Sequence, residues 1–577
     1  MPLSFLYHKI KNTLRKIDMK LEHAKYVRMD KMPKKIEYFE GGLYDAVYEA
    51  SCKWPHNVAL SYFDTEVTYK EMIKKINRVA SALKMLDAKK GDHITICMPN
   101  TPEAIYMLYA VNEIGAVANM VHPLSSELEI EDYLNQSHSK IMLCIDVSYP
   151  KVEAILKNTE VEQVIVVSPS RSMDFIVRVL YKLTKGRKNH IKNTQQVLTW
   201  DKFLSRASKF IGNPHARVNS TDDAVIMYSG GTTGKPKGII LSNLNFNAQA
   251  LGAKYLLPEM VRTENSYLAF LPNFHAFGLG VCIHLPLYFG SRTVLIPQFN
   301  AKKFKSYLTK YKVNVIVGVP TVFEHMTKIK FGQDELRDVK VMVCGGDIMS
   351  GTTKTMINDF MFAHGSRAVI QNGYGLTEAS GGFILSTPSN TDIPDAIGYT
   401  LAGNDAIIIN PKTHKEVPIG EDGEIVVRGV AVMKEYLNDK KATDEAFVEV
   451  GGLKYLRTGD IGYVDNKQIF HFKTRLKRMI ISNGYNIYPT NIEDITKKCE
   501  LVEACAVVGK DDELRGQKVV VFVVAKKDAP ERVIKKELGN IYKKNLAKYE
   551  TPREIRFIEK LPQTKLAKVD FKALELL

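Results

Sequence analysis

The chain contains no long hydrophobic run, and this absence argues against a membrane-spanning helix. A span needs about 20 mostly apolar residues, and the best candidate, residues 279–287, is too short and contains His284. The first residues also lack the uninterrupted apolar core and the small-residue cleavage site of a secretory signal peptide. We therefore expect a cytoplasmic protein, whose membrane contact, if any, is peripheral and at the inner membrane face.

Cysteine pairs at metal-ligand spacing are missing too. The seven cysteines include no CxxC pair and no cysteine beside a histidine cluster, which argues against a zinc site. Most of them lie in apolar runs, as expected for reduced, buried cysteines of a cytosolic protein. The chain also lacks a nucleic-acid-binding motif, and its lysines are scattered. The net charge of +16 therefore favours nucleotides, coenzyme A or membrane phosphates over nucleic acid as partners.

A chain of 577 residues is too long for one hydrophobic core, so we expect two or more domains. Strand and helix patterns alternate up to about residue 220, which predicts an α/β fold with largely parallel sheets. A smaller α/β unit at the end of the chain has predicted strands at 504–508 and 518–524 and a predicted helix at 532–545. The residues from 169 to 198 are interpreted as a surface insertion. The predicted division is a basic N-terminal extension (1–40), a large domain (41–474) and a small domain (475–577).

Residues 1–22 predict a basic amphipathic helix. Apolar residues recur at helical spacing, and lysines and arginines surround them. Such a helix either packs on its own domain or lies on an anionic lipid surface as an interfacial anchor. The sequence leaves both interpretations open.

A glycine-rich loop lies between two short apolar runs, 224–228 and 238–241, which predict strands. Glycines let a backbone present successive N–H groups to one anion, and hydroxyls and lysines add donors and positive charge. The loop comprises Ser229, Gly230, Gly231, Thr232, Thr233, Gly234, Lys235, Pro236 and Lys237. It is not a Walker A loop, because Pro236 follows the lysine where serine or threonine is required. A structural hairpin is the alternative, but the paired threonines and lysines favour a polyphosphate cradle.

Three distant segments accompany this loop: residues 372–378 (NGYGLTE), 458–460 (TGD) and 561–568 (LPQTKLAK). Together, and in this order, the four motifs resemble those of the adenylate-forming superfamily, which includes acyl-CoA synthetases, luciferases and nonribosomal adenylation domains. The resemblance extends from about Leu43 to the end of the chain, and it is strongest to bacterial long- and medium-chain fatty acyl-CoA synthetases. It implies a large AMP-binding domain followed by a small, mobile C-terminal domain.

The resemblance also implies which residues bind the nucleotide and coenzyme A. Besides the loop, they are Gly345, Gly346, Asn372, Gly373, Tyr374, Gly375, Thr377, Asp460, Arg475, Lys477 and Gly484. A carboxylate suits the two hydroxyls of a ribose, which is the implied role of Asp460, with Arg475 as the second ribose contact. Lys477 would be the hinge between the domains, and Gly484 would let the pantetheine arm of coenzyme A pass.

Three residues are given catalytic roles by the resemblance: Lys568, Glu378 and His275. Glu378 supplies a hard oxygen ligand and would hold Mg²⁺ together with Ser229. A lone histidine in an apolar segment is usually structural, but His275 resembles the histidine between the acyl pocket and the nucleotide. Lys568 would stabilise the charge that develops when the acid attacks ATP.

The apolar segments 278–287 and 313–320 are expected to line the acyl pocket, although apolar segments of this kind also form ordinary core. Three positions depart from the usual pattern of the family. Asp347 replaces a small residue beside the pocket, Glu435 replaces a glycine, and Ala567 replaces the glycine before the lysine.

The implied reaction activates a carboxylic acid with ATP to acyl-AMP and then transfers the acyl group to coenzyme A, giving acyl-CoA, AMP and pyrophosphate. The enzyme must align two anions, the carboxylate and ATP, and neutralise the negative charge that develops between them. It does not need a covalent nucleophile of its own. Coenzyme A is favoured because no phosphopantetheine-attachment motif follows. We expect a long- or medium-chain fatty acid, with an aryl or other acid as the alternative. A non-catalytic binding module is the alternative of another class, and the retained Glu378, Asp460, Arg475 and Lys568 argue against it.

Overall fold

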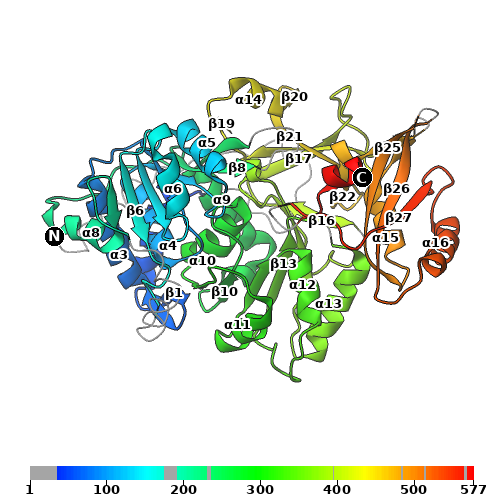
Figure 1. The fold of residues 1–577 in the computed structure, drawn as a ribbon, viewed down its shortest axis with the longest axis horizontal. Coiled ribbons are helices and arrows are strands. Elements are labelled where there is room, and N and C mark those ends of the chain that lie inside the picture. The colour runs from blue at the N-terminus through cyan, green and yellow to red at the C-terminus, as the bar shows by residue number, and fades with distance from the viewer. Residues whose placement is uncertain are drawn as a thin grey trace.

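The computed structural model describes residues 36–173, 191–229, 236–347, 349–393, 395–482, 485–512, 515–564 and 568–577. The basic helix expected at the N-terminus and most of the expected insertion lie outside these residues. The described chain has a mixed α/β fold with a large N-terminal domain and a small C-terminal domain, which lies at one end of the molecule (Figure 1).

One sheet of the large domain has eight strands in the order β19-β9-β8-β4-β3-β5-β6-β7. Neighbouring strands from β8 to β7 are parallel, and β9 and β19 add antiparallel pairs at one edge. The strands are β3 His93–Cys97, β4 Val117–Met120, β5 Ile141–Ile145, β6 Gln163–Val167, β7 Val197–Thr199, β8 Asp223–Ser229, β9 Lys237–Ser242 and β19 Glu435–Tyr436. The two strands predicted beside the glycine-rich loop are β8 and β9, which form a hairpin.

Helices pack on and beside this sheet, and several carry the expected start signals. In α3, Thr68 and Glu71 form a capping box, and α4 begins with Pro102 after a Thr101 cap. The helices are α2 Leu43–Lys53, α3 Tyr69–Lys84, α4 Pro102–Glu113, α5 Glu127–Ser137, α6 Tyr149–Ile155 and α8 Trp200–Ser205. All residues of α4 are buried, including two glutamates.

A second sheet has fourteen strands, ordered β17-β18-β21-β22-β16-β15-β14-β13-β12-β10-β11-β1-β2, with β20 on β21. Its central strands, from β14 to β1, are parallel, whereas the strands from β15 to β17 are antiparallel. The strands are β1 Val58–Tyr62, β2 Thr65–Thr68, β10 Ser266–Ala269, β11 Arg292–Leu295, β12 Val315–Gly318, β13 Val341–Gly345, β14 Ile370–Tyr374, β15 Ile384–Leu385, β16 Ala396–Thr400, β17 Asn404–Ile409, β18 Gly423–Gly429, β20 Phe447–Val450, β21 Leu453–Val464 and β22 Phe470–Arg475.

The register of this sheet brings the predicted motifs together. Gly345 on β13 lies opposite Gly373 on β14, and Asp460 on β21 lies opposite Arg475 on β22. The helical segments of this region are α9 Asn243–Leu256, the π-helical segment Gly278–His284, α10 Leu285–Tyr288, α11 Phe304–Lys310, α12 Pro320–Thr327, α13 Gly351–Ala363 and α14 Lys440–Ala446.

The small domain has a five-stranded sheet in the order β24-β23-β26-β25, with β27 beside β26. Its elements are β23 Ile480–Ser482, β24 Tyr485–Ile487, α15 Pro489–Thr496, β25 Val502–Asp512, β26 Gly516–Ala525, α16 Glu531–Asn545, β27 Glu554–Phe557 and α17 Phe571–Leu576. The strands expected at 504–508 and 518–524 and the helix expected at 532–545 lie within β25, β26 and α16, so these predictions are confirmed. The domain boundary at residue 475 stays a prediction.

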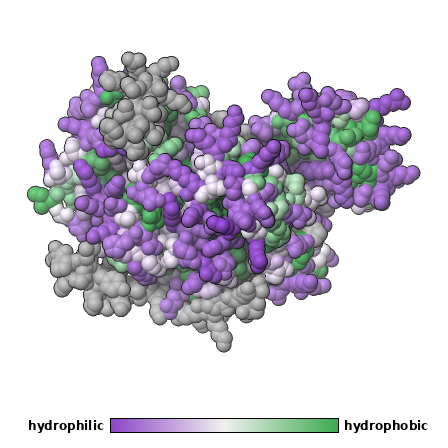
Figure 2. All heavy atoms as spheres, turned by 90° about the horizontal axis from the view of Figure 1, so that it is seen from below, coloured by the Kyte–Doolittle hydropathy of each residue, from purple (hydrophilic) through white to green (hydrophobic). Residues whose placement is uncertain are grey.

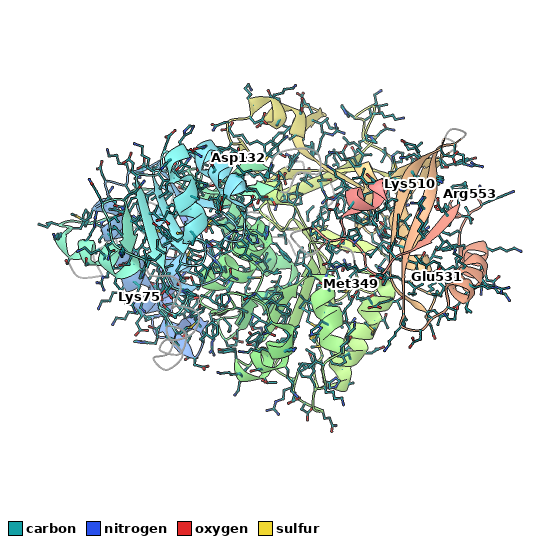
Figure 3. The ribbon with its side chains drawn as sticks, viewed as in Figure 1. Lys75, Asp132, Met349, Lys510, Glu531 and Arg553 are labelled. Carbon is teal, nitrogen blue, oxygen red and sulfur yellow. The ribbon has the colours of Figure 1, made fainter. Side chains whose placement is uncertain are left out.

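The surface is largely hydrophilic, and the small domain stands apart from the main body (Figure 2). Among the side chains labelled in Figure 3, Lys75 and Asp132 belong to the large domain, and Lys510 and Arg553 belong to the small one. Among the described helices, none combines the length and the apolar composition that a membrane crossing requires. All seven cysteines are free. Six are buried, whereas Cys52 is exposed, so the expectation of burial is wrong for that residue.

Candidate active site

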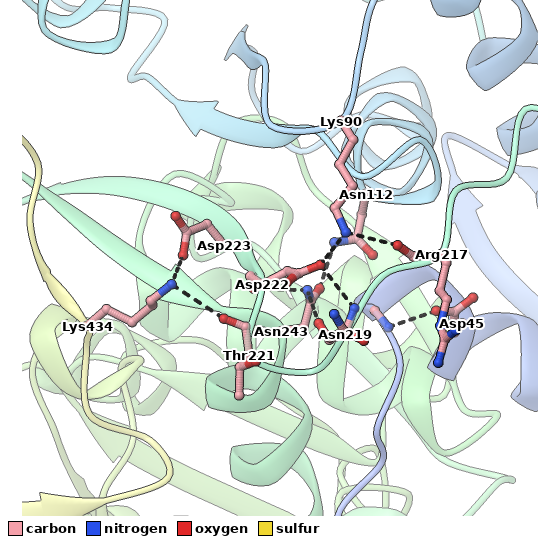
Figure 4. Close-up of polar contacts among 11 residues, drawn as sticks. Asp45, Lys90, Asn112, Arg217, Asn219, Thr221, Asp222, Asp223, Asn243 and Lys434 are labelled. Atoms are coloured by element: carbon pink, nitrogen blue, oxygen red, sulfur yellow. Dashed lines mark hydrogen bonds and ion pairs between the residues drawn. The ribbon is translucent and has the colours of Figure 1, made fainter. Parts of the chain in front are cut away.

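The outer end of the β8–β9 hairpin is held by ion pairs and amide contacts. Lys90 pairs with Asp222 at 2.7 Å, and Lys434 pairs with Asp223 at the start of β8 (Figure 4). The side chain of Asn243, the first residue of α9, donates to the backbone carbonyl of Asp222 at 3.1 Å. These contacts fix the hairpin at the end away from the glycine-rich loop.

The other end of the hairpin presents the loop. Ser229 and Lys237 face each other across the last pair of β8 and β9. Lys237 is exposed, and its ammonium lies 4.8 Å from the centre of the Tyr436 ring. The remaining predicted phosphate-binding residues of the loop lie outside the described residues; they are Gly230, Gly231, Thr232, Thr233, Gly234 and Lys235.

Glu378 lies beside the same tyrosine. The Tyr436 hydroxyl donates to Glu378 Oε1 at 3.0 Å, and the backbone carbonyl of Glu378 accepts from Met433 N at 2.7 Å. Burial and then the Glu378 charge raise the pKa of Tyr436. Thr377 and Glu378 belong to one short 3-10 turn. The Glu378 carboxylate is therefore held close to Lys237, the last residue of the glycine-rich loop. Tyr436 contacts both charged groups: its hydroxyl donates to Glu378, and its ring faces the Lys237 ammonium.

The ribose pair predicted from the sequence is formed by neighbouring strands. Asp460 is only 3% exposed; its Oδ2 accepts from the Tyr374 hydroxyl at 2.8 Å, and Arg475 Nε lies 3.1 Å from its Oδ1. Burial raises the pKa of Asp460, whereas Arg475 and Tyr374 lower it. Tyr374 is buried, whereas Arg475 is exposed. Asn372 donates its amide to the carbonyl of Ala396 at 2.7 Å, and its place beside the adenine stays a prediction.

The glycines of β13 and β14 are required by close backbone contacts. A Cβ at Gly345 would lie 2.8 Å from the carbonyl oxygen of Gly373, and one at Gly375 would lie 2.6 Å from that of Gly381. Gly346 has a φ of +79°, which favours glycine and makes the predicted tight turn. The backbone segments at Gly345, at Gly373–Gly375 and at Gly381 therefore lie against one another, too close for side chains at these glycines.

His275 lies near this point with its ring partly buried. Its Nε2 is buried and has no hydrogen-bond partner among the described residues, and its ring centre lies 5.0 Å from that of Phe274. Burial, and then the positive charges of His122 and Lys568, lower the pKa of His275 to about 4. The imidazole is therefore neutral at neutral pH, and its unpaired nitrogen can bind a polar group of a ligand.

Lys568 comes from the small domain, where its backbone carbonyl accepts from Thr564 N at 2.7 Å. Much of the residue is exposed, but protein surrounds its ammonium. Burial lowers its pKa, Asp347 raises it, Arg475 lowers it, and Asp460 raises it. Lys568 is therefore within electrostatic reach of the ribose pair. The same influences also give Asp347, which the sequence marked only as a departure from the family, a place beside the lysine.

One predicted residue lies between the last strand of the large domain and the first strand of the small one. Lys477 is exposed in the 3-10 turn Leu476–Arg478, between β22 and β23. Its role as a hinge stays a prediction. Gly484 lies outside the described residues.

A small apolar cavity of about 40 Å³ lies next to Gly373. It is lined by Gln249, Ala253, Met260, Phe277, Val281, Leu285, Val343, Gly373, Gly381, Gly382, Phe383, Ile384, Leu385 and Leu401. Val281 and Leu285 belong to the segment 278–287, as expected. The segment 313–320 does not line this cavity, and its residues Val315–Val317 are buried in the core; whether the segment lines the acyl pocket stays a prediction.

Comparison with known proteins gives the family. The AMP-binding enzyme family matches residues 48–437, and the AMP-binding enzyme C-terminal domain matches residues 491–568. The long-chain-fatty-acid–CoA ligase of Bacillus subtilis is 28% identical, with 90% of this chain and 92% of that protein covered. The 2-succinylbenzoate–CoA ligase of Listeria monocytogenes is also 28% identical, with 89% and 95% covered.

Solved structures share the fold. ATP-bound MatB from Rhodopseudomonas palustris matches with a TM-score of 0.80 and 22% identity, covering 93% of this chain and 99% of that one. The anthranilate CoA ligase AuaEII with anthranoyl-AMP matches with a TM-score of 0.79 and 22% identity, covering 93% and 96%. The family match spans most of the chain and agrees with the four motifs. The protein therefore belongs to the AMP-binding family of adenylate-forming enzymes.

Proposed function

We propose that this protein is an AMP-forming acid–CoA ligase that uses ATP to join a carboxylic acid to coenzyme A. The observation that carries the proposal is the convergence of two domains on one site. Besides burial, the charge of Lys568, in the small domain, lowers the pKa of His275, and the charges of Asp347, Arg475 and Asp460 in turn act on the pKa of Lys568. The relatives named above are CoA ligases, and the sequence carries four motifs that resemble those of the family.

In the first half-reaction, a carboxylate oxygen attacks the α-phosphorus of ATP, and the bond from that phosphorus to the leaving pyrophosphate breaks. The attack brings together two anions, so the site must hold them in line and neutralise developing charge. The Lys568 ammonium supplies positive charge, Asp460 and Arg475 hold the ribose, and the glycine-rich loop holds the departing phosphates. Neutral His275 orients the carboxylate through its unpaired nitrogen.

In the second half-reaction, the sulfur of coenzyme A attacks the acyl carbon, the bond from that carbon to AMP breaks, and the thiol proton passes to solvent. Lys568 occupies the approach to the acyl group during the first step. We propose that the small domain then rotates about Lys477, so that the segment containing Gly484 replaces Lys568. Domain closure and rotation of this kind gate many enzymes.

The residues fit a magnesium ion. Glu378 offers a carboxylate and Ser229 a hydroxyl, and Mg²⁺ in nucleotide sites usually takes one or two such ligands together with substrate phosphates and water. Among the described residues there is no cluster of three or more His, Cys, Asp or Glu side chains that could hold a metal alone. When bound, the ion neutralises phosphate charge.

A long- or medium-chain fatty acid is the proposed substrate, because a similar protein is a long-chain-fatty-acid–CoA ligase and the cavity lining is apolar apart from Gln249. An aryl acid is a second candidate, supported by the 2-succinylbenzoate–CoA ligase among the similar proteins. A cavity of about 40 Å³ holds only a few water molecules, so either kind of acid requires neighbouring side chains to move.

Chain length distinguishes the two acids. In an apolar tunnel each added methylene contributes about 0.8 kcal/mol, roughly a fourfold gain, until the tunnel is full. We expect kcat/KM for saturated acids from acetate to palmitate to rise and then level off. A maximum at benzoate, with falling values from octanoate onward, would assign the aryl acid instead.

We also propose that residues 1–22 bring the enzyme to anionic membranes, the source of a lipid substrate. The basic amphipathic pattern supports this. The full chain should sediment with phosphatidylglycerol vesicles, and a chain lacking residues 1–22 should bind them less while keeping its rate on a short soluble acid. Equal sedimentation of both forms would refute the anchor.

A further inference from the structure

The two domains are joined by a hydrogen bond that spans the predicted hinge. Tyr488, the residue before α15, donates its hydroxyl to Asp422 Oδ2 at 2.9 Å. Asp422 lies directly before β18 in the large domain, and Tyr488 belongs to the small domain. Since Lys477 lies between them in the sequence, this contact depends on the orientation of the small domain.

A lysine completes the contact. Lys473 donates to the same Asp422 Oδ2 at 2.8 Å, and its ammonium lies 5.1 Å from the centre of the Tyr488 ring and 5.2 Å from that of Tyr463. The side chains of Lys473 and Asp422 are only about one-third exposed, at 32% and 27%. Lys473 and Tyr463 precede the hinge, so their contacts with each other and with Asp422 persist when the small domain rotates. The hydrogen bond and the cation–π contact of Tyr488 do not.

The rest of this interface includes a repulsive pair. Asp494 on α15 lies near Asp395 of the large domain. Burial raises the pKa of Asp494 to about 6, Lys497 at 3.9 Å lowers it, and the Asp395 charge raises it. The repulsion between Asp494 and Asp395 opposes this orientation, Lys497 reduces that repulsion, and the Tyr488–Asp422 hydrogen bond acts against it.

We propose that Tyr488 is a positioning residue: its bond to Asp422 stabilises the orientation in which Lys568 reaches the active site, and the bond must break before thioester formation. This inference rests on the proposed function, because it assigns the two orientations to the two half-reactions. Tyr488 and Lys568 belong to the same small domain, and the Tyr488–Asp422 bond is present where Lys568 acts on His275.

The two half-reaction rates report the balance of orientations. We assume that each half-reaction proceeds from only one orientation of the small domain, and that the domain rotates faster than the chemical steps. Each observed rate then equals the intrinsic rate of that half-reaction multiplied by the fraction of molecules in the matching orientation. The quotient of the adenylation rate and the thioester rate is then proportional to the ratio of the two orientations. A change in this ratio therefore appears fully in the quotient, whichever orientation predominates in the parent.

The test compares Tyr488→Phe with Tyr463→Phe in the full chain. Both changes remove one hydroxyl from a ring beside Lys473, but only Tyr488 makes a contact between the domains. Adenylation is followed as pyrophosphate release from ATP and acid, and the thioester step as acyl-CoA formed from synthetic acyl-adenylate and coenzyme A. A hydrogen bond to a charged group of this exposure should shift the ratio by about tenfold, equivalent to about 1.4 kcal/mol.

We expect the quotient to fall about tenfold in Tyr488→Phe and to stay within twofold of the parent in Tyr463→Phe. An unchanged quotient in Tyr488→Phe, or an equal fall in both variants, would overturn the proposal. If the parent itself releases no pyrophosphate with any acid, the proposed function fails. The orientation is then tested without turnover, through energy transfer between dyes at Lys412→Cys and Lys536→Cys in a Cys52→Ser background. A distribution unchanged by Tyr488→Phe would refute the role of the bond.

Discussion

Replacing Gly278 by alanine tests how the His275 segment is built. Gly278 begins the π-helical segment and packs against the preceding turn. A Cβ there would lie 2.1 Å from the carbonyl oxygen of Pro272 and 2.8 Å from that of Leu271. Side-chain carbons do not approach backbone oxygens that closely, so one of the two backbone segments must move by roughly 1 Å.

The displaced carbonyl is part of the support of His275. Pro272 O accepts a hydrogen bond from His275 N at 3.1 Å, and His275 O accepts from Leu279 N at 2.8 Å. Overpacking of this kind costs about 1–3 kcal/mol of folding free energy. A misplacement of about 1 Å at a reacting centre can cost up to 100-fold in rate. We therefore expect Gly278→Ala to melt at a lower temperature and to release pyrophosphate 10- to 100-fold more slowly.

Gly539→Ala is the matched control. Gly539 lies inside α16, and a Cβ there would meet nothing within 4 Å. Alanine should raise stability there by about 0.5–1 kcal/mol and leave the rate unchanged. The melting temperatures and the initial rates of pyrophosphate release are measured for Gly278→Ala, Gly539→Ala and the parent. Parent-like stability and rate in Gly278→Ala would refute the packing argument, and a lowered stability with a parent-like rate would refute the dependence of catalysis on His275.

Three further predictions concern single side chains. Lys568→Ala should slow adenylation by about 10²–10³ and spare thioester formation from synthetic acyl-adenylate; equal defects in both steps would show a structural lysine. Glu378→Gln should abolish pyrophosphate release at saturating Mg²⁺ with an unchanged melting temperature; a parent-like rate would refute the metal role. Burial, with a smaller contribution from Asp45, raises the pKa of Glu113 from 4.5 to about 8. The folded state therefore holds this proton more tightly, and stability falls as the pH rises from 4.5 through 8. Glu113→Gln should remove this loss, making the protein more stable than the parent at pH 9 by on the order of a few kcal/mol, and equal urea midpoints at pH 5 and 9 for parent and variant would contradict it.

Local patterns in the sequence predict much of the fold. The strands β8 and β9, the buried strand β13 and its turn at Gly346 follow from β-branched runs bounded by glycine. Motifs predict which segments form the site. Sequence patterns do not distinguish strands that only form the core from strands that line a pocket, because both kinds of strand are apolar. The mostly buried segment 313–320 contributes to the core, and its place in the acyl pocket stays a prediction, whereas Gln249 of α9, which gave no signal, lines the cavity.

Contacts between distant residues are the part that sequence cannot supply. The Tyr436 hydroxyl reaches Glu378 across 58 residues, and Tyr488 reaches Asp422 across 66. Each pair depends on the register of several strands and on the orientation of a whole domain. Asp347 shows the same limit, since its closeness to Lys568 follows only from how the small domain sits on the large one.

Acid-dependent pyrophosphate release is the most direct test of the central claim. The purified chain is incubated with ATP, Mg²⁺ and a panel of fatty and aryl acids, first without and then with coenzyme A. The proposed function predicts pyrophosphate and enzyme-bound acyl-AMP from at least one acid without coenzyme A, and free acyl-CoA and AMP in equal amounts once coenzyme A is added. Release of ADP and phosphate, or no acid-dependent pyrophosphate from any member of the panel, would contradict it.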